Sequence, residues 1–197
     1  MTRILFLLSL IFAAASPSVA AAPSSRAEAV FAGGCFWCTE SDFDHMPGVI
    51  STTSGYVGGT TANPTYEQVS AGGTGHFEAV RVVYDPSKIS YPRLVARFLR
   101  TVDATDGGGQ FCDRGSQYRS AIFVANAEQR RIAEALKAKA ETSLKVPGPI
   151  ATLVLPAAKY YPAEGYHQDY YKKNPVRYRF YRLNCGRDAR LKKVWGG

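Results

Sequence analysis

The chain has 197 residues, 46% of them hydrophobic, which is enough for one domain of ordinary size with a full core. Beyond residue 20 no segment is long and apolar enough to span a bilayer, which excludes a protein with several membrane spans. The formal net charge is +8, with much of the excess near the C-terminus. This charge is compatible with nucleic-acid binding, but a solvated basic surface is the better interpretation.

Residues 1–20 follow the pattern of a secretory signal peptide. Arg3 begins a basic segment, residues 4–15 form a short apolar run, and small residues follow. An uncleaved N-terminal anchor is the alternative. We expect residues 21–27 to be a flexible lead-in and residues 28–197 to form a single domain. The protein should be exported, with the periplasm preferred, monomeric, and without stable membrane insertion once the signal is removed.

The first predicted element is a buried strand that ends at residues 30–32. The glycine pair at 33–34 permits a tight turn, and Cys35 then precedes a helix that includes residues 40–43. Further strands are predicted at 49–55, 77–84, 118–124 and 150–155, helices at 91–102, 127–144 and 167–172, and glycine-rich loops at 55–64 and 103–115. This order predicts an α+β fold, an α/β two-layer sandwich with a ferredoxin-like mixed sheet flanked by helices.

The chemistry of the chain centres on Cys35 and Cys38, which are separated by Phe36 and Trp37. A thiol at a helix N-terminus is expected to ionise near neutral pH, and the two rings beside it predict a small apolar pocket. Three interpretations compete: a thioredoxin-like disulfide exchanger, half of a zinc site, or one nucleophile in an aromatic pocket. Zinc is disfavoured, because the other two cysteines are 73 residues apart, at positions 112 and 185.

Four further groups of residues follow in a recognisable order: 54–59 with 63–66, 75–80, 113–120, and 163–168 with 173–175. Together with the segment Gly33–Cys38 they resemble the A-type peptide-methionine sulfoxide reductases, the family that acts on the S-sulfoxide epimer. The resemblance extends along nearly the whole predicted domain and is specific, since all five blocks keep the family order.

The resemblance implies a role for each matching residue. Cys35 is the nucleophile, and Glu78 is the acid that protonates the sulfoxide oxygen. Glu78 should therefore be buried, with a raised pKa. Tyr56 and Tyr118 match the tyrosines that donate hydrogen bonds to that oxygen. The remaining matches are expected to bind substrate: Phe36 and Trp37 around the methyl group, Asp113 at the substrate backbone, and His167 as a residue that orients a neighbour.

Turnover in this family leaves a sulfenic acid on the nucleophile, which a second thiol must resolve. The resemblance favours Cys185 near the C-terminus, in a tail expected to swing inward, so that a Cys35–Cys185 disulfide meets the external reductant directly. Cys38 is the second candidate, one helical turn from Cys35, at a position where many relatives carry glycine. Cys112, where many relatives carry asparagine, is expected to be either a third redox thiol or a buried small residue.

The sequence therefore predicts a peptide-methionine (S)-S-oxide reductase that acts on oxidised proteins and free methionine sulfoxide. It should use a thioredoxin-like or dithiol reductant, with no metal, no organic cofactor and no nucleic-acid partner. One alternative is a periplasmic thiol–disulfide oxidoreductase that uses Cys35 and Cys38. Another is a binding module in which all four cysteines form structural bridges.

Overall fold

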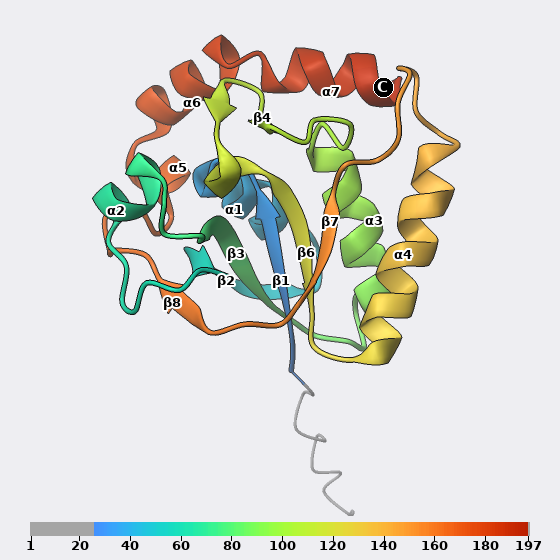
Figure 1. Cartoon of the computed structure of the whole chain (residues 1–197), viewed down its shortest axis with the longest axis horizontal. Coiled ribbons are helices and arrows are strands. Elements are labelled where there is room, and N and C mark those ends of the chain that lie inside the picture. Colours follow the sequence, from blue (N-terminus) through green and yellow to red (C-terminus); the bar gives the residue numbers. More distant parts are fainter. Residues whose placement is uncertain (1–25, 197) are drawn as a thin grey trace, which may run out of the picture.

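The computed structural model describes residues 26–196 of the chain. The predicted signal peptide and residues 21–25 of the predicted lead-in lie outside this range, while Ala27, placed in the lead-in, already begins strand β1. A six-stranded sheet of order β7-β6-β1-β3-β2-β8 forms the centre of the molecule (Figure 1). None of the described helices is long and apolar enough to cross a membrane.

The middle of the sheet is a βαββαβ unit in the order β6-β1-β3-β2, with every neighbouring pair antiparallel. Its elements are β1 (Ala27–Gly33), α1 (Phe36–Asp44), β2 (Val49–Val57), β3 (Phe77–Tyr84), α3 (Tyr91–Thr101) and β6 (Ser120–Val124). This order is that of a ferredoxin-like fold, and the predicted fold class is confirmed.

Two strands extend this unit at its edges. After β6, helix α4 (Ala127–Glu141) crosses over to β7 (Leu153–Pro156), which pairs parallel with β6. Strand β8 (Tyr160–Pro162) pairs antiparallel with β2 at the other edge. The parallel β6–β7 pair makes the sheet mixed, as predicted, because the intervening helix supplies the crossover that a parallel connection needs.

The main core lies between the sheet and the helices on one of its faces. Helix α3 contributes Leu94, Val95, Phe98 and Leu99, all buried and at helical spacing, which confirms the predicted amphipathic helix. Phe31 of β1 joins the two halves, because its ring lies 4.9 Å from the rings of both Phe43 in α1 and Phe98 in α3.

The predicted turn after β1 is confirmed, and it places Cys35 at the N-cap of α1. Gly34 has a φ of +78°, and a Cβ there would lie 2.5 Å from the Cβ of Gln110. Only glycine fits this conformation and this space without strain. The β1–α1 turn therefore brings Cys35 to the edge of the sheet where the site forms.

Several elements differ from the sequence prediction. The predicted loop 103–115 contains a hairpin, β4 (Gly109–Gln110) and β5 (Asp113–Arg114), and a 3-10 turn at Ser116–Tyr118 delays β6 to residue 120. The helices not predicted are α2 (Tyr66–Ala71), α6 (Pro175–Asn184) and α7 (Arg187–Trp195), and the predicted helix at 167–172 is α5 (Tyr170–Lys173). Pro175 begins α6, where its fixed φ suits the first helical turn.

The C-terminal segment is docked onto the domain and is not a loose tail. Arg187 is 2% exposed and donates to the carbonyl oxygens of Gly33 at 3.3 Å and Thr101 at 2.7 Å. Trp195 Nε1 donates to the Val102 carbonyl oxygen at 3.0 Å. Helices α6 and α7 thereby run across the end of the sheet where β1 terminates (Figure 1).

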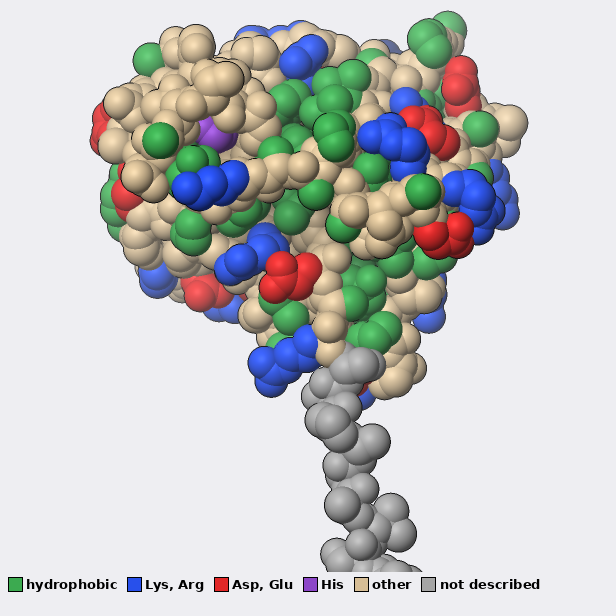
Figure 2. All heavy atoms as spheres, turned by 60° about the horizontal axis from the view of Figure 1, so that its bottom comes forward, with side chains coloured by type: hydrophobic (Ala, Val, Ile, Leu, Met, Phe, Trp, Pro, Cys, Tyr) green, Lys and Arg blue, Asp and Glu red, His purple; other side chains and the backbone are tan. Residues whose placement is uncertain are grey.

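The expected basic surface is also less uniform than its sequence implied. Arg182 contacts Asp42 at 2.9 Å, and Arg190 contacts Asp103 at 2.5 Å, so part of the C-terminal charge is neutralised inside the fold. On the face visible in Figure 2, Lys and Arg side chains alternate with Asp and Glu and form no continuous basic patch.

Candidate active site

A small pocket of about 270 Å³, open to solvent, lies at the N-terminal end of α1. It is lined by Cys35, Phe36, Trp37, Tyr66, Glu78, Asp113, Tyr118 and Tyr181. Six of the nine predicted site residues therefore meet in one place, although they come from separate parts of the chain. Tyr56, His167 and Cys185 do not line the pocket, while Tyr66 and Tyr181 were not predicted to be there.

Cys35 is 7% exposed, and the pKa of its thiol is raised well above the usual value. Burial is the main cause, followed by the Cys38 thiol and the nearby carboxyl groups of Glu78 and Asp113. The expectation of a readily ionised thiol is therefore wrong. Burial outweighs the helix N-terminus, whose Phe36 N–H donates to Glu78 Oε2 at 3.0 Å.

Glu78 lies on β3 and is 2% exposed. Burial raises the pKa of its carboxyl group to about 8, although the hydrogen bond from Phe36 acts in the opposite direction. The predicted burial and raised pKa are thus confirmed. A carboxyl group with this pKa holds a proton at neutral pH and can donate it inside the pocket.

Tyr66 and Tyr118 are half-buried and line the pocket. Burial raises the pKa of Tyr66 to about 12 and the pKa of Tyr118 well above its usual value, so both phenols stay protonated and can act as donors. Tyr66 begins α2, where a capping box between Thr65 and Gln68 fixes the helix start.

Tyr56 was predicted to donate to the sulfoxide oxygen, and the structure contradicts this. Its side chain is fully buried, and its hydroxyl donates to Glu164 Oε2 at 2.9 Å. The other oxygen of Glu164 accepts from the Tyr66 N–H at 2.8 Å. Tyr56 and Glu164 therefore support the backbone of Tyr66, and the tyrosine in the pocket is the one ten residues further along the same predicted loop motif.

His167 holds Trp37 in place and does not face the pocket. Trp37 Nε1 donates to His167 Nδ1 at 3.0 Å, and the indole ring stacks on Tyr170 at a centroid distance of 3.7 Å. Burial lowers the pKa of His167, which keeps the imidazole neutral and Nδ1 free to accept. The contact with Trp37 is the kind expected of a residue that orients a neighbour, and His167 does not line the pocket as a substrate-binding residue would.

Asp113 and Tyr181 close one side of the pocket. The Tyr181 hydroxyl donates to Asp113 Oδ2, and its side chain lines the pocket together with Cys35. Burial raises the pKa of the Asp113 carboxyl group. Tyr181 lies on α6, whose sequence does not predict a helix, so no pattern indicates that this residue reaches the site.

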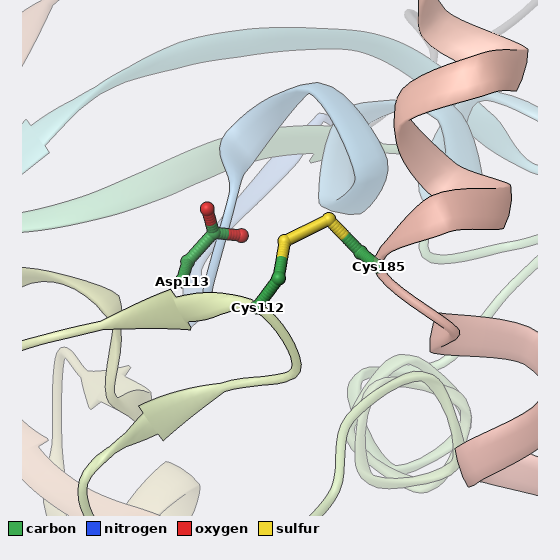
Figure 3. Close-up of side chains that lie close together, drawn as sticks. All are labelled: Cys112, Asp113 and Cys185. Carbon is green, nitrogen blue, oxygen red and sulfur yellow. A yellow bond between two sulfur atoms is a disulfide. The ribbon is translucent and has the colours of Figure 1, made fainter.

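The four cysteines form two different pairs. Cys112 and Cys185 are joined by a disulfide, with their Cα atoms 4.9 Å apart (Figure 3). Cys35 and Cys38 are buried free thiols in the first turn of α1, where the Cys38 N–H donates to the Cys35 carbonyl oxygen at 3.1 Å. The predicted Cys35–Cys185 bond is therefore not the one present. Cys112 is also exposed, which contradicts its description as a buried small residue.

Asp113 lies beside the outer disulfide as well as the pocket. One carboxylate oxygen of Asp113 and the sulfurs of Cys112 and Cys185 lie within 4.8 Å of one another. Thiol, thiol and carboxylate could form three metal ligands, but in the disulfide the two sulfurs are not thiolates. The arrangement present here is therefore a redox group next to an acid.

Comparison with known proteins shows which family combines these features. The peptide methionine sulfoxide reductase family matches residues 27–197.

The chain belongs to this family.

It is 53% identical over 194 residues to peptide methionine sulfoxide reductase MsrA 2 of Caulobacter vibrioides, covering 98% of this chain and 97% of that protein. It is 55% identical over 177 residues to peptide methionine sulfoxide reductase MsrA 2 of Rhizobium meliloti, covering 88% of this chain and 87% of that protein. Among solved structures, methionine sulfoxide reductase A of Corynebacterium diphtheriae matches with a TM-score of 0.68 and 38% identity, covering 79% of this chain and 77% of that chain. Reduced Mxr1 from Saccharomyces cerevisiae matches with a TM-score of 0.67 and 30% identity, covering 80% of this chain and 91% of that chain.

Membership of the reductase family bears on the alternatives left open by the sequence. A thiol–disulfide exchanger needs only the two cysteines of α1, and a buried protonated carboxyl group beside them has no part in its chemistry. The binding module with four bridged cysteines is contradicted, because Cys35 and Cys38 are not in disulfides within the described chain. The methionine sulfoxide reductase interpretation accounts for Glu78, the two phenols and the aromatic pocket together.

Comparing Tyr66→Phe with Tyr56→Phe tests the corrected assignment of the tyrosines. Tyr66→Phe removes a donor from the pocket and should lower kcat/KM for methionine sulfoxide by about 10²-fold with little change in stability. Tyr56→Phe removes a buried hydrogen bond to a carboxylate and should lower the free energy of unfolding by about 1.5–3 kcal/mol. Steady-state kinetics and urea unfolding of both variants make the comparison. A larger catalytic loss in Tyr56→Phe than in Tyr66→Phe would restore the original assignment.

Proposed function

We propose that this reductase converts the S epimer of methionine sulfoxide, free or in oxidised proteins, to methionine. A sulfoxide sulfur is a poor electrophile until its oxygen is protonated or hydrogen-bonded, so the site needs a nucleophile and a neutral acid together. One observation carries the proposal. The Glu78 carboxyl group, with a pKa of about 8, accepts a hydrogen bond from the backbone N–H of Phe36, the residue next to Cys35.

In the proposed mechanism the sulfoxide oxygen lies between the Glu78 carboxyl group and the hydroxyls of Tyr66 and Tyr118. Glu78 supplies a proton to the sulfoxide oxygen, the phenols donate hydrogen bonds, and Cys35 Sγ attacks the electrophilic sulfur, while the proton of the Cys35 thiol passes to the Glu78 carboxylate. The sulfur–oxygen bond of the substrate breaks, and the oxygen ends as a hydroxyl on Cys35. The substrate sulfur gains two electrons, and the Cys35 sulfur loses two.

The pocket walls support the choice of substrate. Phe36 and Trp37 offer apolar surface for the terminal methyl group, and Trp37 is held rigid by Tyr170 and His167. Asp113 lines the same pocket, where its carboxylate can accept from the backbone N–H of a peptide substrate. The volume of about 270 Å³ includes the open mouth, so the enclosed part suits a methyl sulfoxide group better than a large ring.

The sulfenic acid on Cys35 must be reduced through a disulfide and an external dithiol, and we propose a thioredoxin-like protein as the natural donor. The signal-peptide pattern of residues 1–20 supports export, with the periplasm as the proposed compartment. The protein would work there as a monomer, without an organic cofactor, a metal or a nucleic-acid partner.

The proposal is tested with the separate S and R epimers of N-acetyl methionine sulfoxide, using dithiothreitol as reductant. The expected result is consumption of the S epimer only, with one methionine derivative formed for each sulfoxide lost. Consumption of neither epimer by folded protein, together with reduction of insulin disulfides, would contradict the proposal and favour the thiol–disulfide oxidoreductase.

A further inference from the structure

Helix α6 turns its apolar side chains outward. Val176, Phe180 and Leu183 are 82%, 67% and 76% exposed, and no residue of this helix, which lies wholly within the described chain, is fully buried. Because successive residues of a helix are rotated by about 100°, these three side chains lie within roughly 60° of one another. They form one exposed apolar strip, which we call the outer face of α6. Contiguous exposed apolar side chains of this kind mark an interaction surface.

The opposite side of the same helix carries residues that belong to the site. Tyr181 lines the pocket, and Cys185, whose N–H donates to the Tyr181 carbonyl oxygen at 3.0 Å, is bonded to Cys112. By the same rotation, Tyr181 lies about 140° and Cys185 about 180° from Val176. Figure 3 shows the Cys185 side chain extending from the end of α6 toward the β4–β5 hairpin. The outer face therefore points away from both the pocket and the disulfide.

The segment around α6 is basic. Residues 170–187 contain six Lys or Arg side chains and no Asp or Glu. Two of the six arise from arginines that point inward, where they contact Asp42. Arg177 and Arg179 are exposed, and neither forms an ion pair with another residue of the described chain. On the helix they lie on either side of the outer face, which is thus an apolar strip between two cations.

An apolar strip between cations is typical of a helix that lies in the plane of a membrane surface. The apolar side chains enter the boundary between headgroups and acyl chains, and the Lys or Arg side chains beside them attract anionic lipids. A protein partner in the reaction fits this face less well. An oxidised protein has to reach the pocket, a dithiol has to reach the disulfide, and both lie toward the other side of α6.

We propose that the outer face of α6 docks this enzyme on the surface of a membrane that contains anionic lipids. The three apolar side chains enter the interface, and Arg177 and Arg179 contact the lipid phosphates. The contact is peripheral, because the helix stays in the plane of the membrane and inserts side chains alone. Docking goes beyond the proposed function, since the binding of lipid requires no turnover.

This orientation leaves the site accessible while the enzyme is bound. With the outer face on the lipid, Tyr181 and Cys185 stay on the side of α6 that is turned away from the membrane. The pocket remains open to methionine sulfoxide in other proteins, and the disulfide remains open to a dithiol from solution. Docking therefore favours one class of substrate, oxidised proteins that are held at the same membrane surface.

The test measures binding of the enzyme to sucrose-loaded lipid vesicles by co-sedimentation. The protein used is the chain from residue 21, which contains every described element and lacks the apolar run at residues 4–15. Its affinity for vesicles of mixed phosphatidylcholine and phosphatidylglycerol should exceed that for phosphatidylcholine alone by at least about tenfold, and high salt should weaken the binding. Equal affinity for the two compositions, or binding to neither, would overturn the proposal.

Phe180→Ser/Leu183→Ser tests the apolar part of the contact. The affinity for the mixed vesicles should fall by at least about tenfold, because two apolar side chains no longer enter the interface. Ile50→Ser is the matched control, since Ile50 is an exposed apolar residue on β2, and it should bind as the wild type does. Wild-type affinity in the double variant, or an equal loss in the control, would contradict the role of α6.

Arg177→Gln/Arg179→Gln tests the cationic part of the contact. It should remove most of the preference for phosphatidylglycerol, because each arginine near the surface adds to the attraction of anionic lipid. The matched control is Arg93→Gln/Arg97→Gln, which removes the same charge from exposed positions on α3. An equal loss in the two variants would show attraction by net charge alone and would contradict docking through one face.

Enzyme assays without vesicles distinguish docking on lipid from docking of a protein. Both α6 variants should reduce N-acetyl methionine S-sulfoxide at the wild-type rate, with dithiothreitol or with a bacterial thioredoxin as donor. A lower kcat/KM for thioredoxin with unchanged binding to vesicles would assign the outer face to the protein reductant and overturn the proposal. Inactivity of the wild type would contradict the proposed function, while the vesicle measurement decides the docking separately. Circular dichroism spectra that match wild type establish that the variants fold.

Discussion

Cys35→Ser is expected to form no methionine, even in a single turnover with the enzyme in excess over S-sulfoxide. The serine hydroxyl is a far weaker nucleophile than a thiol, and its oxygen cannot become a sulfenic acid. We expect a loss of at least about 10³-fold relative to wild type, the scale on which removal of a nucleophile acts. Quenched-flow sampling with chromatographic detection of methionine measures it.

The matched control for this variant is Cys38→Ser. Both substitutions change a buried thiol in the first turn of α1 to a hydroxyl of similar size. Cys38→Ser should still release about one methionine per enzyme, because Cys38 acts only after the substrate sulfur has been reduced. Methionine formation by Cys35→Ser at a rate near that of the control would show that another residue is the nucleophile.

Glu78→Gln is expected to lower the rate of the first turnover by about 10²–10⁴-fold. The amide keeps the size of the side chain, and its oxygen can still accept from the Phe36 N–H. It has no acidic proton to give to the sulfoxide oxygen. A stopped-flow or quenched-flow rate within about threefold of wild type would show that Glu78 is not the acid, since general acid catalysis contributes far more than this.

The same variant should change how stability depends on pH. The folded-state pKa of Glu78 is about 8, above the ordinary value of 4.5, so the folded protein holds a proton that the unfolded chain has lost. The contribution of Glu78 to stability is therefore complete below about pH 4.5 and is lost as the pH rises toward about 8. Urea unfolding across this range should show a steeper loss of stability in wild type than in Glu78→Gln. Parallel profiles would contradict the raised pKa.

Much of the sheet could be predicted, because its strands carry buried β-branched residues between clear turns. The C-terminal helices could not. No residue of α6, which lies wholly within the described chain, is fully buried, and three of its apolar residues face solvent. Without an inward apolar stripe, its sequence lacks the pattern from which a docked helix is predicted. Burial of Arg187 could not be predicted either, because a guanidinium that donates to backbone carbonyl oxygens has no signature in the sequence.

Site residues that a motif identifies singly could be predicted from the sequence. Contacts between residues that only the fold brings together could not. Cys35 and Glu78 stand out through their motifs. Tyr56 and Tyr66 belong to the same motif, and only the hydrogen bonds to Glu164 show which of them faces the pocket. The pairing of the outer cysteines could not be predicted from their spacing, because it depends on a contact between the β4–β5 hairpin and the end of α6.

The central claim is that Cys35 takes the oxygen of the sulfoxide. The most direct measurement uses the variant Cys38→Ser/Cys112→Ser/Cys185→Ser, in which Cys35 is the remaining cysteine of the chain. This variant is mixed with S-sulfoxide and dimedone, and both methionine and labelled peptides are quantified by mass spectrometry. The account predicts about one methionine per enzyme and an equal amount of dimedone on the Cys35 peptide. Methionine formed without label on Cys35, or label formed equally from the R epimer, would contradict it.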